Sequence, residues 1–159
     1  MNRISIINKE QLLSITNFID NNGHEFNFFK KMGWNIKNIE SQLSKDNNYS
    51  LGYYEANILA GLLIGDTIKN EKYYDLELHI LFVSKELRRK QIATKLLNYV
   101  ETSNINFSKI FIEVAEDNVE AISFYQKNNF VFLNFRHNYY KYNDKNIHAK
   151  CFIKKINHE

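Results

Sequence analysis

The amino-acid sequence predicts an α/β fold in which helices cover both sides of a sheet. Segments with strand-like alternation and segments with helical spacing follow one another in the order β-α-α-β-β-β-α-β-α-β-β. The longest predicted strand, Tyr74–Val83, is partly apolar on both of its faces, which is typical of a strand between two layers of helices. No linker, repeat or low-complexity segment divides the 159 residues, so we expect a single domain over 1–159.

The first half of the chain carries two helical segments and a strand hairpin after a short first strand. Apolar residues recur at helical spacing in both helical segments, and Ala56-Asn57 forms a two-residue connection between the hairpin strands. The expected elements are a strand at Ile4–Ile7, helices at Gln11–Ile19 and Trp34–Leu43, and strands at Tyr49–Glu55 and Ile58–Gly65.

The second half alternates strands and helices. Strict alternation in its first strand places Glu77, His79, Leu81 and Val83 on one face, and Leu78, Ile80 and Phe82 on the other. Asn118 can cap a following helix, because its side-chain oxygen can accept a hydrogen bond from the first turn. We expect a helix from Ile92, a strand at Lys109–Val114, a helix at Val119–Lys127, and strands at Phe130–Arg136 and His148–Lys154 separated by a polar, tyrosine-rich loop.

Composition and charge limit the kinds of function. The formal net charge of +3 is small for this length, whereas duplex DNA usually requires a dense basic stripe, so we expect no DNA partner. The single cysteine, Cys151, excludes an intrachain disulfide and is expected to be a buried small apolar group. The first residues lack the apolar core of a signal peptide, and the longest apolar stretch, Ile58–Ile64, is shorter than the ~20 residues that span a bilayer. We therefore expect a soluble cytoplasmic protein with no membrane partner and, since no metal-ligand spacing occurs, no metal site.

A strand, a basic loop and a helix follow directly on one another between Val83 and Leu97. A helix that begins at such a loop points free backbone N–H groups and the positive end of its dipole at the loop. Together with Arg88, Arg89 and Lys90, these groups would form a cradle for a pyrophosphate. A solvated basic turn before a surface helix is the alternative, and the residues alone favour neither.

Three segments resemble the GNAT superfamily of acyltransferases. Arg88-Arg89-Lys90-Gln91-Ile92-Ala93 resembles its acetyl-CoA motif, Arg/Gln-x-x-Gly-x-Gly/Ala, and the segment from Phe111 to Phe130 resembles its second signature. Arg136-His137-Asn138-Tyr139-Tyr140 is similar to the Arg-x-Asn-Tyr-Tyr of the RimI-type subfamily, the ribosomal-protein-alanine N-acetyltransferases. The resemblance implies a GNAT-like fold, with a mixed, mostly antiparallel central sheet and helices on both faces, and acetyl-CoA as the co-substrate.

The resemblance also implies which residues bind acetyl-CoA. Backbone groups of Leu81, Phe82 and Val83 would pair with the pantetheine arm as though it were an added strand. Gln91 stands where the motif has its first glycine, a residue that lets the backbone approach phosphate closely, so we expect this departure to weaken cofactor binding or re-shape the loop without abolishing binding. The other implied contacts come from Arg88, Arg89, Lys90, Gln91, Ile92, Ala93, Thr94 and Asn118, of which Asn118 could instead be a simple helix cap.

Acetyl transfer to an amine requires one group that takes a proton from the amine and another that protonates the departing thiolate. The resemblance implies Glu113 as the general base and Tyr125 as the acid, with direct attack and no acyl-enzyme. The alternatives are a strand-end carboxylate paired with a lysine for Glu113 and a core aromatic for Tyr125. Glu77 matches the base position of some other branches and is the reserve candidate, whereas His79 is expected to be structural.

The predicted acceptor site contains Glu77, Tyr139 and Tyr140. Tyrosine suits the binding of an extended peptide end, because it offers a flat apolar face and one hydroxyl. The resemblance implies the N-terminal α-amino group of a protein such as a small-subunit ribosomal protein as the acceptor. The subfamily's acidic pair appears here as Ile147-His148, so polycationic amines should bind weakly. The alternatives are a small-molecule amine acetyltransferase, a non-catalytic acyl-CoA-binding domain and, less favoured, an RNA-binding protein; the sequence predicts no oligomeric state.

Overall fold

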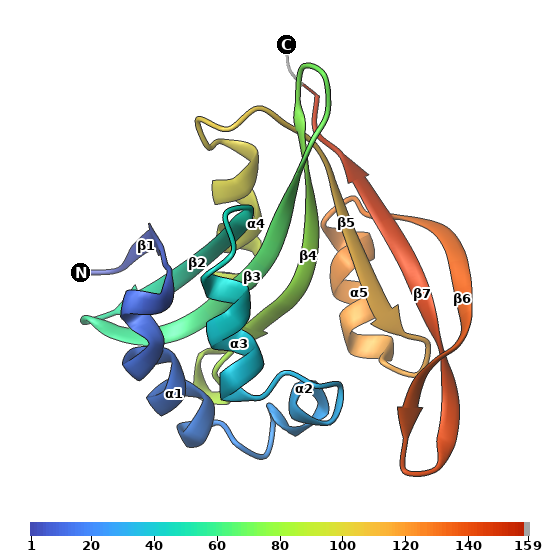
Figure 1. Ribbon diagram of the computed structural model, residues 1–159, viewed down its shortest axis with the longest axis horizontal. Helices are drawn as coiled ribbons and strands as arrows, with labels where there is room; N and C mark the ends of the chain where they lie inside the picture. Colours follow the sequence, from blue (N-terminus) through green and yellow to red (C-terminus); the bar gives the residue numbers. More distant parts are fainter. Residues whose placement is uncertain (158–159) are drawn as a thin grey trace.

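The structure is a computed structural model that describes residues 1–157. Over these residues the strands form one seven-stranded sheet in the order β1-β2-β3-β4-β5-β7-β6 (Figure 1). Every neighbouring pair is antiparallel except β4 and β5, which are parallel. The strands are β1 (Arg3–Ile6), β2 (Asn48–Glu55), β3 (Ile58–Lys69), β4 (Tyr74–Val83), β5 (Phe107–Ala115), β6 (Val131–Tyr142) and β7 (Lys145–Lys155). This arrangement confirms the expected mixed, mostly antiparallel sheet.

Helices cover both faces of the sheet, as Figure 1 shows. One apolar cluster packs beneath α1 and α3 with Phe26 and Phe29, and the other lies between the sheet and α4 and α5. The helices are α1 (Leu12–Asn21), α2 (Asn27–Lys31), α3 (Ile36–Leu43), α4 (Ile92–Glu101) and α5 (Val119–Lys127), and short 3-10 turns η1 (Lys9–Gln11) and η2 (Lys85–Leu87) precede α1 and α4. The five-residue α2 was not predicted, because it is too short to show a helical repeat. None of the helices in residues 1–157 is long and apolar enough to cross a membrane.

Two strand connections show how small residues close tight hairpins. Ala56 and Asn57 join β2 to β3 with φ values of 48° and 67°, which confirms the predicted two-residue turn. Asn143 and Asp144 join β6 to β7 in the same left-handed region, with φ values of 47° and 59°. The predicted tyrosine-rich loop is therefore wrong: these residues belong to a long hairpin. The apolar alternation that marks a half-buried strand is missing there because most of β6 is exposed on both faces.

A β-bulge interrupts the pairing of β3 with β4. Ile64 pairs with Ile80 and the next residue, Gly65, pairs with Leu78, so His79 is an extra residue on β4. Gly65 permits this close approach, because a Cβ there would lie only 2.6 Å from the backbone oxygen of Glu77.

The bulge shifts the side-chain alternation along β4, so the predicted grouping of its faces is wrong for Leu78. In the structure Leu78 packs with Leu81 and Val83 in the cluster beneath α4 and α5, whereas Ile80 and Phe82 pack in the opposite cluster. Strict period-two alternation cannot hold across an inserted residue. The inserted residue, His79, lies at the functional site described next.

Candidate functional site

The parallel strands β4 and β5 separate towards their C-terminal ends (Figure 1). Their ladder ends at the pair Leu78–Ile112, although β4 continues to Val83 and β5 to Ala115. On its other edge, this part of β4 still pairs with β3. The edge of β4 that faces β5 therefore presents backbone groups with no strand partner in residues 1–157. The three residues expected to pair with pantetheine, Leu81, Phe82 and Val83, lie on this part of β4.

The basic loop between β4 and α4 contains two residues in the left-handed region. Arg89 has a φ of 64° and Gln91, the N-cap of α4, has a φ of 59°. Gln91 thus adopts a backbone conformation that glycine adopts more easily, at a cost of ~1–2 kcal/mol. The loop therefore keeps a left-handed residue at this position, although glutamine stands in place of the motif glycine. No side chain of residues 1–157 caps α4, so the first-turn amides of Ile92, Ala93 and Thr94 point into the loop without a capping partner.

The charged side chains of this loop are arranged differently from one another. Arg88 folds back onto the end of β4, where its Nε donates to the carbonyl of Val83 at 3.3 Å and its guanidinium lies 5.7 Å from the ring centre of Phe82. Arg89 and Lys90 are exposed. The loop therefore presents two exposed positive charges beside the uncapped first turn of α4.

Asn118 caps α5, as expected. Its Oδ1 accepts a hydrogen bond from the backbone N–H of Ala121 at 3.1 Å. Because α5 follows β5 directly, this cap lies just beyond the opening between β4 and β5.

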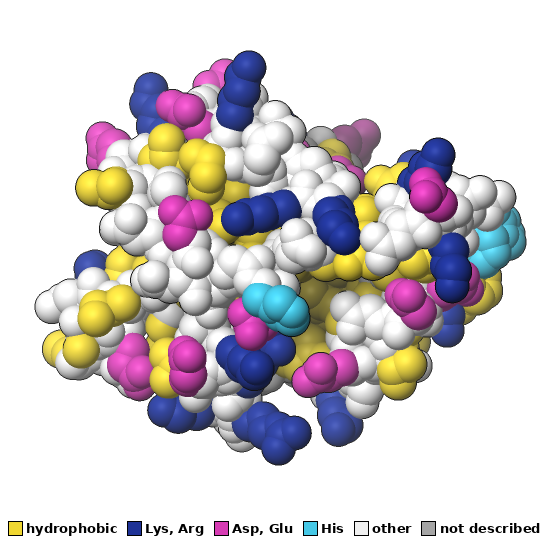
Figure 2. All heavy atoms as spheres, turned by 90° about the horizontal axis from the view of Figure 1, so that it is seen from below, with side chains coloured by type: hydrophobic (Ala, Val, Ile, Leu, Met, Phe, Trp, Pro, Cys, Tyr) yellow, Lys and Arg dark blue, Asp and Glu magenta, His cyan; other side chains and the backbone are white. Residues whose placement is uncertain are grey.

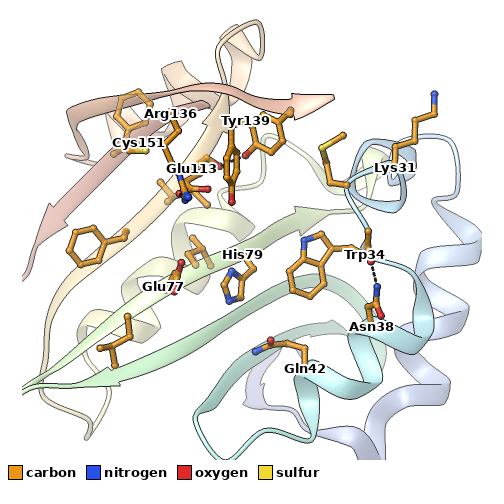
Figure 3. A pocket seen from close by; sticks show the side chains of 18 of the residues that line it. Lys31, Trp34, Asn38, Gln42, Glu77, His79, Glu113, Arg136, Tyr139 and Cys151 are labelled. Carbon is orange, nitrogen blue, oxygen red and sulfur yellow. Dashed lines mark hydrogen bonds and ion pairs between the residues drawn. The ribbon is translucent and has the colours of Figure 1, made fainter. Parts of the chain in front are cut away.

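A groove of about 1280 Å³ runs along the sheet beside this opening and appears as a hollow with an apolar floor in Figure 2. One wall comes from α2, α3 and β4, and the other from β5, β6 and β7. Figure 3 shows Trp34, Gln42, Glu77 and His79 on the first wall, and Glu113, Arg136, Tyr139 and Cys151 on the second. The groove brings together Glu113 and all three residues of the predicted acceptor site.

Glu113 is ion-paired on the second wall. Its Oε1 accepts a hydrogen bond from Nη1 of Arg136, and the guanidinium of Arg136 lies 4.2 Å from the ring centre of Tyr139. The hydrogen bond to Glu113 raises the pKa of Arg136 above its ordinary value. The carboxylate is paired with an arginine rather than with the lysine of the alternative reading, and its side chain is 28% exposed.

Both predicted tyrosines lie beside Glu113. The register of β6 with β7 jumps between Arg136 and Tyr140, and this irregularity includes Tyr139. The Tyr140 hydroxyl donates to the backbone carbonyl of Glu113 at 3.4 Å, and its ring packs 5.8 Å from that of Phe28. Burial, followed by the charge of Glu113, raises the pKa of Tyr140 above its ordinary value. The pKa of Tyr139 is also raised, first by burial and then by Glu113.

Tyr125 lies on α5 and is buried, with 6% of its surface exposed. Its ring packs at 5.2 Å against those of Phe124 and Phe130 and belongs to the apolar cluster beneath α4 and α5. Burial, with a smaller contribution from Tyr140, raises the pKa of its hydroxyl above the ordinary value, so the hydroxyl keeps its proton at neutral pH.

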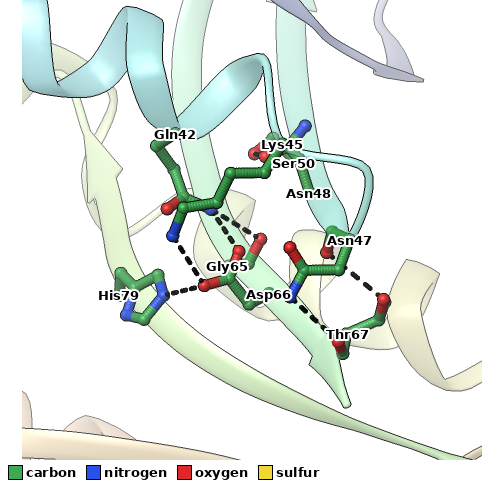
Figure 4. A network of polar contacts seen from close by, with 9 residues as sticks. All are labelled: Gln42, Lys45, Asn47, Asn48, Ser50, Gly65, Asp66, Thr67 and His79. Atoms are coloured by element: carbon green, nitrogen blue, oxygen red, sulfur yellow. Dashed lines mark hydrogen bonds and ion pairs between the residues drawn. The ribbon is translucent and has the colours of Figure 1, made fainter. Parts of the chain in front are cut away.

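The first wall contains a polar network that was not predicted from the sequence (Figure 4). The carboxylate of Asp66, on β3, accepts hydrogen bonds from Gln42 Nε2, from Lys45 Nζ at 3.2 Å and from His79 Nε2 at 3.0 Å. Burial raises the pKa of Asp66, but the three hydrogen bonds outweigh it and lower the pKa below its ordinary value. His79 is thus paired with an ionised carboxylate.

Two other expectations concern cysteine and metals. Cys151 is half-buried and lines the groove, so its prediction as a buried apolar group is wrong. It pairs with Glu113 across β5 and β7, and burial, followed by the charge of Glu113, raises the pKa of its thiol. Within residues 1–157, no cluster of three or more His, Cys, Asp or Glu could hold a metal ion.

A model of the acetyltransferase (GNAT) family matches residues 15–130, which is most of the chain. The chain belongs to this family, and it is an N-acetyltransferase that uses acetyl-CoA. The match includes the opening between β4 and β5, the basic loop and α5, and it ends before the β6–β7 hairpin that forms part of the acceptor wall. A search of curated proteins found no significant match.

Several solved structures have the same fold along almost the whole chain. The ribosomal-protein-S18-alanine N-acetyltransferase from Escherichia coli is 20% identical with a TM-score of 0.79, covering 100% of this chain and 96% of its own. NAA60 from Arabidopsis thaliana, in complex with a bisubstrate analogue, is 15% identical with a TM-score of 0.78, covering 99% of both chains. Ard1 from Thermoplasma volcanium is 19% identical with a TM-score of 0.75 and also covers 99% of both. These similarities confirm the GNAT-like fold.

Proposed function

We propose that this single-domain enzyme acetylates the N-terminal α-amino group of a protein, such as a small-subunit ribosomal protein. The observation that carries this proposal is the open groove, which runs between Trp34 on one wall and Tyr139 on the other and reaches the point where β4 and β5 separate. An extended chain end could lie along this groove with its amine at the opening. The similarity to the Escherichia coli enzyme named for the alanine of ribosomal protein S18 supports this choice of acceptor.

In this proposal acetyl-CoA binds at the unpaired edge of β4. Leu81, Phe82 and Val83 offer backbone groups to the pantetheine arm in the manner of an added strand. The remaining cofactor contacts come from the basic loop, the first turn of α4 and the cap of α5, with Arg88, Arg89, Lys90, Gln91, Ile92, Ala93, Thr94 and Asn118 as the contact residues. The positive end of the α4 dipole and two exposed basic side chains suit a pyrophosphate.

Glu113 and Tyr125 carry the proton transfers in this proposal. The carboxylate of Glu113 takes a proton from the attacking nitrogen, directly or through one water, and Arg136 holds it in place. Tyr125 protonates the departing sulfur, which is consistent with a buried hydroxyl that keeps its proton at neutral pH. The nitrogen attacks the thioester carbonyl directly, the C–N bond forms and the C–S bond breaks, so no acyl-enzyme is needed.

The charge of the groove favours a peptide over a polycationic amine. Its lining contains the acidic residues Glu77 and Glu113, whereas the basic residues that line it are Lys31, Lys45, Arg136 and Lys141. Because the basic groups outnumber the acidic ones, a polyamine gains little attraction there. In this proposal Glu77, on the first wall of the groove, contacts the ammonium group of the acceptor.

The test compares initial acetylation rates for a free Ala-starting peptide, the same peptide blocked at its N-terminus, and spermidine. We expect the free peptide to react and the blocked one not to react, with spermidine slower than the free peptide. Glu113→Gln should lower the rate with the free peptide by ~10²–10⁴-fold. Equal rates with the free and blocked peptides, or a clear preference for spermidine, would reject N-terminal acetylation.

A further inference from the structure

His79 and Glu113 occupy equivalent places on the two strands that separate. Each is the first residue beyond the last pair of the β4–β5 ladder, Leu78–Ile112. Both line the groove, His79 on the wall of β4 and Glu113 on the wall of β5 (Figure 3). The proposed place of acetyl transfer is thus flanked by two side chains that can accept a proton, one from each strand.

The hydrogen bond to Asp66 fixes which nitrogen of His79 is free. An ionised carboxylate can only accept, and the pKa of Asp66 is lowered, so Nε2 of His79 must carry the proton of the 3.0 Å contact. In the neutral ring, Nδ1 then keeps its lone pair. Within the described part of the chain, Nδ1 has no hydrogen-bond partner, so it can accept a proton from a molecule in the groove.

The imidazole also packs against an aromatic ring. The indole of Trp34 lies 5.4 Å from it with an angle of 33° between the rings, and the His79 side chain is 21% exposed. Asp66 is itself held by Gln42 and Lys45, as Figure 4 shows. A histidine that is oriented by a buried carboxylate and open to the groove on one edge resembles a catalytic imidazole more than a solvent-exposed surface residue.

Acetylation of an ammonium group requires the nitrogen to lose two protons. The first leaves to create the lone pair that attacks the thioester, and the second leaves as the amide forms. One of them ends on the released thiol and the other in solvent. A single carboxylate would have to act twice in each turnover, whereas two bases could each act once.

Resting on the acetyl transfer proposed above, we propose that His79, oriented by Asp66, is a second catalytic base that takes the first proton from the acceptor ammonium. His79 Nδ1 receives this proton and passes it to water at the mouth of the groove. Glu113 receives the second proton after the C–N bond has formed, and Tyr125 supplies the proton that converts the thiolate to the thiol. Exchange with water restores Glu113 and Tyr125, so protons and charges balance. Asp66 is a positioning residue in this scheme.

The charges around His79 come from every element that faces it. Lys45 follows α3, Asp66 lies on β3, Glu77 precedes it on β4, and Glu113 and Arg136 lie across the groove on β5 and β6. The further titratable groups that line the groove are Lys31 on α2, Tyr139, Tyr140 and Lys141 on β6, and Cys151 on β7.

The test is the pH dependence of kcat/KM for the free Ala-starting peptide, measured for the parent, His79→Gln, Asp66→Asn and Glu113→Gln. Glutamine at position 79 can still donate to Asp66 but cannot take a proton. His24→Gln makes the same chemical change at an exposed position outside the groove and serves as the matched control. Circular dichroism and calorimetry of acetyl-CoA binding check the fold and the cofactor site of each variant.

We expect His79→Gln to lower kcat/KM by up to ~10-fold at pH 7, because roughly a tenth of an α-amine is already unprotonated at that pH, and to return to the parent value as the pH rises above ~8. Asp66→Asn should show the same pH-dependent recovery with a smaller loss. Glu113→Gln should stay impaired at high pH, because the second proton is still present on the nitrogen after attack. His24→Gln should match the parent throughout.

Parent-like activity of His79→Gln at pH 7, or an equal loss at all pH values, would overturn the proposal. A second measurement uses the parent protein and so does not depend on whether Asp66→Asn folds. ¹⁵N NMR spectra should place the proton of the neutral His79 ring on Nε2. A proton on Nδ1 instead would overturn the proposal. A clear preference of the parent for spermidine would reject the peptide acceptor and not the second base. With spermidine as the acceptor, the pH at which His79→Gln recovers parent activity should rise to ~10, the pKa of an alkylamine. If no such recovery occurred, the proposed role of His79 as a base would be rejected.

Discussion

Gly65 determines how closely β3 approaches the bulge of β4, and Gly65→Ala is the sharpest perturbation of this geometry. A Cβ at this position would lie 2.6 Å from the Glu77 backbone oxygen and 2.9 Å from Cδ1 of Leu76. Carbon–oxygen contacts between strands are usually ~3.3 Å or longer, so the two strands must separate by about 0.7 Å. Overpacking of this kind costs ~1–3 kcal/mol, and we expect the free energy of unfolding to fall by that amount.

The displacement also affects the groove, because Glu77 and His79 are adjacent to the contact. A shift approaching 1 Å in residues that position reacting groups lowers kcat/KM by up to ~10²-fold. Urea denaturation measures the stability, and initial rates with the Ala-starting peptide measure the activity. Gly23→Ala is the matched control, since its Cβ would meet the nearest atom at 3.4 Å, an ordinary contact, and its unfolding free energy should change by no more than ~1 kcal/mol. A Gly65→Ala protein as stable and active as the control would refute the role given to this close approach.

Three other substitutions test the remaining parts of the site. Tyr125→Phe should lower turnover by ~10²-fold or more. The affinity for acetyl-CoA in calorimetry should not change, because the ring and its packing remain. An equal loss of affinity would contradict a role of Tyr125 in proton transfer alone. Joint replacement of Arg89 and Lys90 by alanine should weaken acetyl-CoA binding, more at low salt than at high salt, and an equal loss at both salt concentrations would exclude an electrostatic contact. Asp66→Asn should lower the unfolding free energy by ~1–3 kcal/mol at pH 7. The pKa of Asp66 is lowered in the folded protein, so its ionised carboxylate stabilises the fold at pH values above ~4, the ordinary pKa of a carboxyl group. This stabilisation is lost as the pH falls through the lower pKa that Asp66 has in the folded protein. The difference in unfolding free energy between parent and variant should therefore be smaller in urea titrations at pH 3 than at pH 7. A larger difference at pH 3 would contradict a lowered pKa of Asp66.

Local signals in the sequence predicted much of the fold. The strand Tyr74–Val83 and the helix Val119–Lys127 have the predicted bounds, because each is marked by a continuous period and the helix by the cap of Asn118. The connection of Ala56 and Asn57 was predicted for a similar reason, since a two-residue turn has a local signature. These are features that depend on neighbours within one or two turns of the chain.

What the sequence did not predict depends on residues far apart. The partners of Asp66 lie 24, 21 and 13 positions away, and only the pairing of β3 with β4 and the packing of α3 bring them together. No local pattern marks His79 as an inserted residue, so strict alternation placed Leu78 on the wrong face. The two strands of the β6–β7 hairpin were predicted, but too short and with a loop between them, because both faces of β6 are largely exposed and the apolar alternation that marks a strand is absent there.

Acetyl transfer at this site is tested most directly by a crystal structure of the protein with a bisubstrate analogue, in which coenzyme A is linked to the N-terminus of an Ala-starting peptide. We expect the pantetheine arm to pair with Leu81–Val83 in the opening between β4 and β5. We also expect the peptide to lie between Trp34 and Tyr139, with its linked nitrogen between His79 and Glu113. A pantetheine arm outside that opening, or a peptide that leaves the groove empty, would contradict the proposal.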